Sequence, residues 1–222
     1  MSQSLSHLLP NRRSFLTGAA ATGVYTFLVP PAQAAAAKPD ADINVIGPKP
    51  GYSPQIGTLV SMLTWMSPAA TRALKGITVA QLDYLFDANA NSIGALLLHL
   101  AASEVLYQRI TFDGADPEKL GADYDKPWGA AMELGDRGRK EIKGHDLDFY
   151  LGKLDEVRAK SLAEFKKRDD AWLMTVDKTW GWGPTNNYCK WFHVCEHISH
   201  HAGQIDILIK RAPGYKAPNG QG

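Results

Sequence analysis

Four long stretches of the chain place apolar residues three and four positions apart, which is the spacing of one face of an α-helix. They are expected at residues 53–68, 87–112, 146–165 and 185–212. Ser53-Pro54 suits the start of the first stretch, Asp146 suits the cap of the third, and Pro213-Gly214 is a stop signal for the fourth. Because each stretch has one apolar face, the four helices are expected to share a core.

The segments that connect these stretches are irregular. Residues 113–145 contain Gly, Pro and Trp128 and are long for a link between two helices of a bundle, so a short helix is expected within them. In residues 176–184, Trp180-Gly181-Trp182-Gly183 suits a brief hairpin. The sequence therefore predicts an all-α fold, a four-helix bundle with a long crossover between its second and third helices.

The first residues have the features of an export signal. Asn11-Arg12-Arg13-Ser14-Phe15-Leu16-Thr17 resembles the twin-arginine motif, an apolar run follows to Val29, and Ala32-Gln33-Ala34 has the form that signal peptidase cuts. The run is short for a membrane anchor, which needs about 20 residues. We therefore expect cleavage after Ala34 or within the next three alanines, and a periplasmic or secreted protein. The twin-arginine route exports folded proteins, which favours a cofactor loaded inside the cell.

The expected organisation is a signal peptide at 1–34, a linker at 35–50, the bundle at 51–214 and a tail at 215–222. Removal of the signal peptide from the 222 residues leaves 188, enough for one domain with a full-sized core. The signal peptide carries two arginines and no acid, so the formal charge falls from +1 to −1. This balance argues against nucleic acid as a partner. No other segment is apolar enough for a membrane span.

Two cysteines and one arginine also need an interpretation. Cys189 and Cys195 fall on one expected helix and point to different sides of it, so they are expected to be unpaired thiols, with Cys195 half-buried. Arg158 falls inside the apolar stripe of the third helix. We expect its stem to pack on the core and its head to lie in water.

Four of the seven histidines lie within residues 193–201 of the fourth helix. At about 100° per residue, the stripe of Val194, Ile198, Ile205, Leu208 and Ile209 faces the core. His197 and His201 lie on or beside this stripe, whereas His193 and His200 lie off its edge. Since His197 and His201 are one turn apart, both imidazoles can reach a single ion.

Two neutral imidazoles make a weak site, so a third ligand is needed from another helix. His99 borders the apolar stripe of the second helix, within Leu96-Leu97-Leu98-His99-Leu100. A lone histidine on such a face is more often a hydrogen-bonded core residue, but the inward pair on the fourth helix favours a ligand. His193-Val194-Cys195-Glu196-His197 also fits the inverted zinc-peptidase pattern H-x-x-E-H. That pattern needs a further acidic ligand downstream and a larger fold, so we interpret this match as coincidence.

Two segments resemble the DinB-like (DinB/YfiT) superfamily. Asn91 to Glu104 is similar to its second-helix signature, and His197-Ile198-Ser199-His200-His201-Ala202-Gly203-Gln204-Ile205 is similar to its fourth-helix signature, H-x-x-H-H-x-G-Q. The resemblance implies a four-helix bundle that holds a divalent metal ion, usually zinc or nickel, on His99, His197 and His201. It also implies a possible homodimer. Ala202 departs from the pattern, since many members carry arginine there.

Known activities in this superfamily include thiol-dependent transferases and a maleylpyruvate isomerase that use small thiols. The first hypothesis is therefore a divalent-metal-dependent enzyme, a transferase or a hydrolase, with an unknown small substrate. Those thiols are cytosolic, however, which fits an exported protein poorly. The second hypothesis is a non-catalytic periplasmic bundle that binds a metal or a small ligand, with His193 and His200 at the rim. The third is a structural bundle whose histidines only hydrogen-bond one another, which leaves buried polar atoms to satisfy.

No side chain stands out as a catalytic base. Glu104 and Glu196 are candidates for a base or for a partner of a metal ligand. We expect Glu196 to lie on a solvated face, whereas both interpretations stay open for Glu104. Tyr107, Trp180 and Trp182 suit either the lining of a pocket or ordinary packing.

Overall fold

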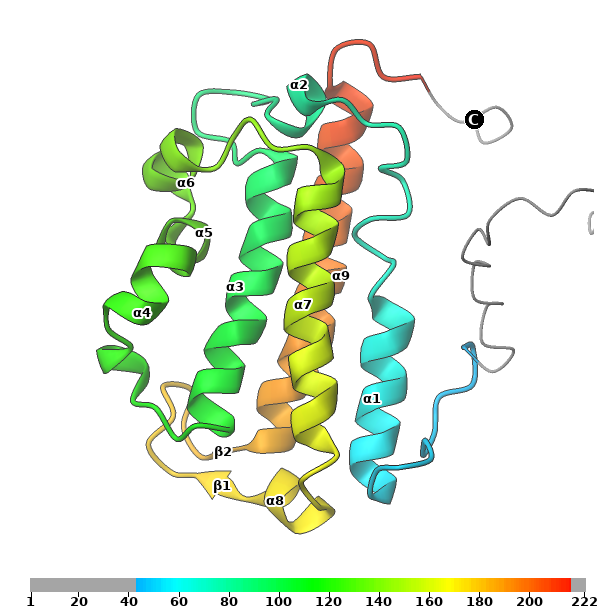
Figure 1. The fold of residues 1–222 in the computed structure, drawn as a ribbon, viewed down its shortest axis with the longest axis vertical. Helices are drawn as coiled ribbons and strands as arrows, with labels where there is room; N and C mark the ends of the chain where they lie inside the picture. Colours follow the sequence, from blue (N-terminus) through cyan, green and yellow to red (C-terminus); the bar gives the residue numbers. More distant parts are fainter. Residues whose placement is uncertain (1–42, 217–222) are drawn as a thin grey trace, which may run out of the picture. The chain divides into compact units, whose positions relative to one another are not determined.

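The computed structural model describes residues 43–216, and these are mostly helical (Figure 1). The expected signal peptide, most of the linker and most of the tail lie outside the described residues. The long helices are α1 (Pro54–Met66), α3 (Ile93–Thr111), α7 (Leu147–Phe165) and α9 (Asn187–Arg211). The short elements are α2 (Val79–Leu82), η1 (Pro117–Lys119), α4 (Ala122–Tyr124), η2 (Asp125–Gly129), α5 (Ala130–Glu133), α6 (Gly135–Glu141), α8 (Asp170–Met174), β1 (Val176–Asp177) and β2 (Thr185–Asn186).

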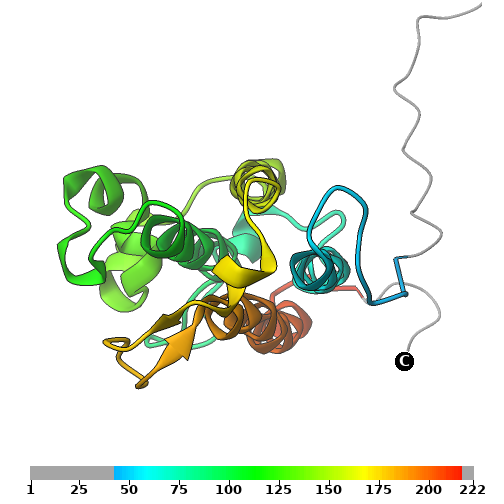
Figure 2. The ribbon, with the colours of Figure 1, turned by 90° about the horizontal axis from the view of Figure 1, so that it is seen from below.

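The four long helices form the bundle, and helix α3 has a central place in it. It packs against both α7 and α9, and α1 packs against α9 (Figures 1 and 2). The faces that meet carry the apolar stripes expected from the sequence, and Leu59, Leu97 and Ile205 are among the fully buried side chains. The prediction of an all-α four-helix bundle is therefore confirmed.

Side-chain caps determine where most of these helices begin. Asp146 accepts a hydrogen bond from the backbone N–H of Phe149, and Asn186 accepts one from that of Cys189, so α7 and α9 begin where the sequence predicts. The second long helix begins at Ile93, six residues later than expected. Ser92 is its cap, whereas the carboxylate of Asp87 accepts from the N–H of Asn89 in a tight turn.

The long crossover between α3 and α7 is folded into short helical turns. Elements η2 and α5 pack along α3, and α6 packs against α5 (Figure 1). This layer covers the side of α3 that faces away from α1 (Figure 2). Its position is important because it brings backbone groups of α5 against a histidine of α3.

The sequence between α8 and α9 forms the expected hairpin. Strands β1 and β2 pair antiparallel, with Val176 opposite Asn186 and Asp177 opposite Thr185. The loop between them carries Trp180 and Trp182, and the second strand leads directly into α9. Among residues 43–216, none of the helices is long and apolar enough to cross a membrane.

Candidate metal centre

Three histidines from two helices meet in the interior of the bundle. His197 Nε2 lies 3.2 Å from Nε2 of His99 and 2.9 Å from Nε2 of His201. His99 comes from α3, and His197 and His201 come from successive turns of α9, as the helical wheel predicts. His99 and His201 are buried and His197 is half-buried. In the part of the chain that the structure describes, these three residues form the one group of histidine, cysteine and acidic side chains that could hold a metal ion.

The outer nitrogens of two of these rings are bonded to oxygen atoms. His99 Nδ1 lies 2.8 Å from the carbonyl oxygen of Ala131 on α5, and His201 Nδ1 lies 2.7 Å from the side-chain oxygen of Gln204. Both oxygens accept, so both Nδ1 atoms carry the proton. In a neutral ring the other nitrogen then has a free lone pair. The Nε2 atoms of His99 and His201 are therefore acceptors that point toward His197.

This arrangement fits a metal ion better than a set of hydrogen bonds. His197 Nε2 carries at most one proton, so it can donate to only one of its two neighbours, and the other contact joins two lone pairs. Tetrahedral zinc, with bonds of about 2.0–2.1 Å, places two ligand nitrogens ~3.3–3.4 Å apart. The two contacts of His197 Nε2, at 3.2 and 2.9 Å, are close to this spacing, and the ligand atoms of all three histidines lie within 4.8 Å of one another. The residues present therefore fit a divalent ion, and a purely hydrogen-bonded cluster leaves a buried acceptor unsatisfied.

Burial also keeps the three rings in the form that binds metals. Desolvation lowers the pKa of His197 to about 3, with smaller contributions from the neighbouring charges of His201 and His99. Burial lowers the pKa of His99 and of His201 as well. Neutral imidazoles are thus present at pH 7, so few protons compete with a metal ion for the lone pairs.

The other histidines of α9 lie around this cluster without joining it. The ring of His193 stacks on that of His197, with centroids 5.4 Å apart, and its Nδ1 lies 2.8 Å from the hydroxyl of Tyr107. His200 is exposed and contacts the edge of His201. The expectation that both lie at the rim agrees with the structure. Trp182 of the hairpin loop packs edge-on against His193.

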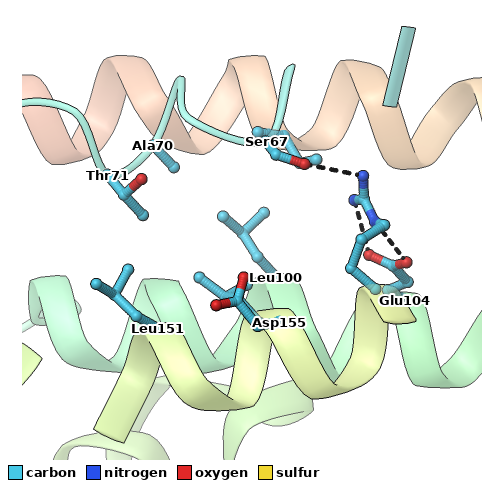
Figure 3. A pocket seen from close by; sticks show the side chains of 10 residues that line it. Ser67, Ala70, Thr71, Leu100, Glu104, Leu151 and Asp155 are labelled. Carbon is cyan, nitrogen blue, oxygen red and sulfur yellow. Dashed lines mark hydrogen bonds and ion pairs between the residues drawn. The ribbon is translucent and has the colours of Figure 1, made fainter. Parts of the chain in front are cut away.

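Glu104 is not part of the histidine group and has a structural partner. It forms a two-pronged ion pair with Arg158 of α7 (Figure 3). It also accepts a hydrogen bond from Ser161. Arg158 also donates to Ser67 and to the carbonyl oxygen of Leu63. The expectation that the head of Arg158 lies in water is therefore wrong, because a buried carboxylate and a helix-end carbonyl together satisfy it.

This ion pair lines a small cavity between α3, α7, α9 and the segment that follows α1. Leu100 and Leu151 form part of its apolar wall, and Ser67, Thr71 and Asp155 lie around it (Figure 3). Since the carboxylate of Glu104 is already bonded to Arg158 and Ser161, it is not available as a base for chemistry at the histidines.

The remaining candidates occupy the surroundings that the sequence suggests. Glu196 is exposed, as expected, so the H-x-x-E-H match has no acid directed at the cluster. Both cysteines are free; Cys189 is exposed, whereas Cys195 is more deeply buried than expected. Burial raises the pKa of the Cys195 thiol to about 12, so it is an inert core residue.

Comparison with known proteins places the chain in a family. Residues 58–212, which include all three histidines, match the family model of mycothiol-S-transferase. The chain belongs to this family. Mycothiol-S-transferases are DinB-like, so the resemblance drawn from the sequence is confirmed at that level.

A solved structure supports the fold of this mycothiol-S-transferase family member. A conserved protein from Enterococcus faecalis superposes with a TM-score of 0.53 over 70% of this chain and 95% of its own, at 16% identity. At this identity the likeness concerns the fold alone. No curated protein matches the chain.

Sequence reasoning missed the groups that orient the histidines. Ala131 contributes a backbone oxygen, which has no signature in the sequence, and the helix α5 that carries it is too short to show a helical period. Gln204 stands in the H-x-x-H-H-x-G-Q segment, three residues after His201, so its spacing was a usable signal. The bond between Tyr107 and His193 joins two helices and depends on their packing.

Proposed function

We propose that this protein is a divalent-metal-dependent enzyme that transfers a small thiol to an electrophilic substrate. The observation that carries the proposal is the meeting of three neutral Nε2 atoms from His99, His197 and His201. Membership of the mycothiol-S-transferase family supports thiol transfer over other metal-dependent reactions. Zinc and nickel are the ions that best suit three imidazole ligands.

The residues of the chain hold the ion and leave part of its surroundings open. His99 and His201 are fixed by Ala131 and Gln204, so their lone pairs keep their direction before an ion arrives. His197 is half-buried, so one side of the cluster is accessible from solvent. When bound, the ion supplies a Lewis acid that favours the ionised form of a thiol or of water.

A non-catalytic metal- or ligand-binding protein is the second candidate. Among the described residues, no acidic side chain joins the three histidines, and Glu104 is held by Arg158. Such a protein would need no base near its ion. The proposed export signal also favours this candidate, because small thiols are cytosolic and an exported protein leaves them behind. We propose that the protein is exported and that residues 1–34 are removed.

The first test measures metal in protein purified without a histidine tag from its own host. We expect one zinc or nickel ion per chain, and loss of the ion in His197→Ala, since two imidazoles make a weak site. His145→Ala is the matched control, because His145 stacks on Phe149 outside the cluster. An empty wild-type protein, or full metal content in His197→Ala, would contradict the proposal.

The second part of the test distinguishes the metal-dependent enzyme from a non-catalytic metal- or ligand-binding protein. The metal-loaded protein is assayed with mycothiol and with a simple alkyl thiol against conjugation electrophiles, and with esters and amides without thiol. Thiol conjugation that a chelator abolishes supports the transferase, and chelator-sensitive hydrolysis alone supports a hydrolase. If the protein holds metal but no reaction depends on the ion, the binding candidate replaces the enzyme.

A further inference from the structure

The three histidines of the centre are supported in different ways. His99 and His201 each donate from Nδ1 to an oxygen, which is the usual way in which proteins fix the ring of a metal ligand. In contrast, His197 Nδ1 has no hydrogen-bond partner among residues 43–216. A half-buried ring without such a bond can turn about its side-chain torsions, so another contact is needed to direct its Nε2 atom.

The ring of His193 provides that contact. Its plane is inclined by 21° to that of His197, and the centroids lie 5.4 Å apart, which is within the range of an offset stack. Because the two residues are one turn apart on α9, their side chains lie on the same face of the helix. His193 therefore covers one face of His197 and limits its rotation.

His193 is itself held from two other elements. Its Nδ1 lies 2.8 Å from the hydroxyl of Tyr107 on α3, and Trp182 of the hairpin loop packs edge-on with centroids 5.0 Å apart. Its Nε2 lies 3.7 Å from a carboxylate oxygen of Glu196. Nδ1 of His193 is thus bonded to Tyr107, and His193 is not part of the group that could hold the ion, so it presents the face of its ring to His197 and no ligand atom to the centre.

We propose that His193 is a positioning residue, which Tyr107 and Trp182 hold in place and which directs His197 toward the metal ion. This inference rests on the proposed function, since it needs the ion. It also means that the hairpin loop supports the metal centre, because Trp182 packs on His193 and His193 stacks on the ligand His197. It also explains why His197 can bind an ion without the outer hydrogen bond that the other two ligands have.

The test measures the zinc dissociation constant by competition with a chromogenic chelator. Tyr107→Phe removes only the hydroxyl that holds His193, and His193→Ala removes the stacked ring. Loss of such outer support costs about 10-fold in metal affinity, so we expect each change to raise the zinc dissociation constant by about 10-fold. His193→Phe keeps a ring face against His197, so we expect it to bind zinc more tightly than His193→Ala.

Tyr124→Phe is the matched control for Tyr107→Phe. Its hydroxyl also belongs to a buried tyrosine and also joins two elements, since it donates to the carbonyl oxygen of Ala102 on α3, but it bonds to none of the histidines. We expect it to keep the wild-type zinc affinity. The visible absorption of cobalt-loaded protein, which reports the geometry of the ligands, should change in Tyr107→Phe and His193→Ala and stay unchanged in Tyr124→Phe.

The outcomes separate this inference from the proposed function. If wild-type protein binds zinc and both Tyr107→Phe and His193→Ala bind it equally well with unchanged cobalt spectra, the positioning role is wrong and the metal centre stands. If Tyr124→Phe weakens zinc binding as much as Tyr107→Phe does, the loss of affinity reflects a general effect on the fold, and the inference is also wrong. If wild-type protein binds no zinc, both proposals are overturned.

Discussion

At the scale of single residues, the pair formed by Glu104 and Arg158 shows how a signature position can serve stability. The two side chains are only 5% and 15% exposed, and they join α3 to α7. Breaking such a pair leaves an unpaired buried charge, which costs far more than the pair itself contributes. We therefore assign Glu104 to the stability of the bundle and not to the chemistry of the centre.

The first prediction concerns Glu104→Gln. Because this change leaves the buried guanidinium of Arg158 without a charged partner, we expect the free energy of unfolding to fall by about 3 kcal/mol. Urea denaturation at pH 7 measures it, and metal content should stay unchanged. Glu156→Gln is the control, since Glu156 forms an exposed pair with Lys153 and should cost less than about 1 kcal/mol. A loss of metal in Glu104→Gln with unchanged stability would show that the assignment is wrong.

The ligand residues were predictable from the sequence, but their supports were not. The wheel of α9 separates His197 and His201 from His193 and His200 because apolar neighbours define the inner face. No such rule finds the oxygen of Ala131 or the hydroxyl of Tyr107, since these contacts depend on how separate elements pack. The prediction that the head of Arg158 lies in water failed for the same reason. Its partner Glu104 lies on another helix, so their contact also depends on how the helices pack.

At the scale of elements, the hairpin before α9 is anchored by a charged contact. Lys190 of α9 is 2% exposed, and its ammonium lies 2.8 Å from a carboxylate oxygen of Asp177 on β1 and over the ring of Trp180. The hydrogen bond from Lys190, with others from Thr179, lowers the pKa of Asp177 to about 2. This contact therefore stabilises the fold while Asp177 is ionised.

The second prediction follows from the direction of this pKa shift. A carboxyl with a lowered pKa contributes stability above its unfolded pKa of about 3.9 and loses that contribution as the pH falls toward its folded value. We expect Asp177→Asn to lower the free energy of unfolding by about 1–3 kcal/mol at pH 7, because Lys190 is left unpaired. The difference from wild type should shrink between pH 5 and pH 2.

Denaturation curves at several pH values test this prediction. Asp155→Asn removes an exposed carboxylate of α7 and should change stability by no more than about 0.5 kcal/mol at any pH. A difference between Asp177→Asn and wild type that stays constant down to pH 2 would count against the ion pair as its cause.

The element boundaries show what periodicity can and cannot supply. The starts of α7 and α9 were predictable because Asp146 and Asn186 are single strong caps just before an apolar stripe. The start of α3 was predicted too early, since Asp87 and Ser92 are both suitable caps and only tertiary packing selects the second. The crossover was predicted as mostly irregular because its helical turns are too short to show a period.

At the scale of the whole molecule, the centre joins parts that are distant along the chain. Its ligands come from α3 and α9, the oxygen on His99 comes from α5, and the hairpin supports His193. An unfolded chain does not bring these groups together. An ion held by them therefore binds the folded state and hardly binds the unfolded chain. Metal binding is thus coupled to the stability of the entire bundle.

The last prediction is a thermal shift caused by the ion. At a free zinc concentration about 100 times the dissociation constant, linkage adds about 2.7 kcal/mol to the folded state. For a domain of this size that corresponds to a rise in Tm of about 5–10 °C over chelator-treated protein. His197→Ala should melt at the same temperature with zinc and with chelator, because it lacks one ligand. Equal Tm values for loaded and chelated wild-type protein would mean that the three histidines meet without holding an ion, and calorimetry at several zinc concentrations decides between the two outcomes.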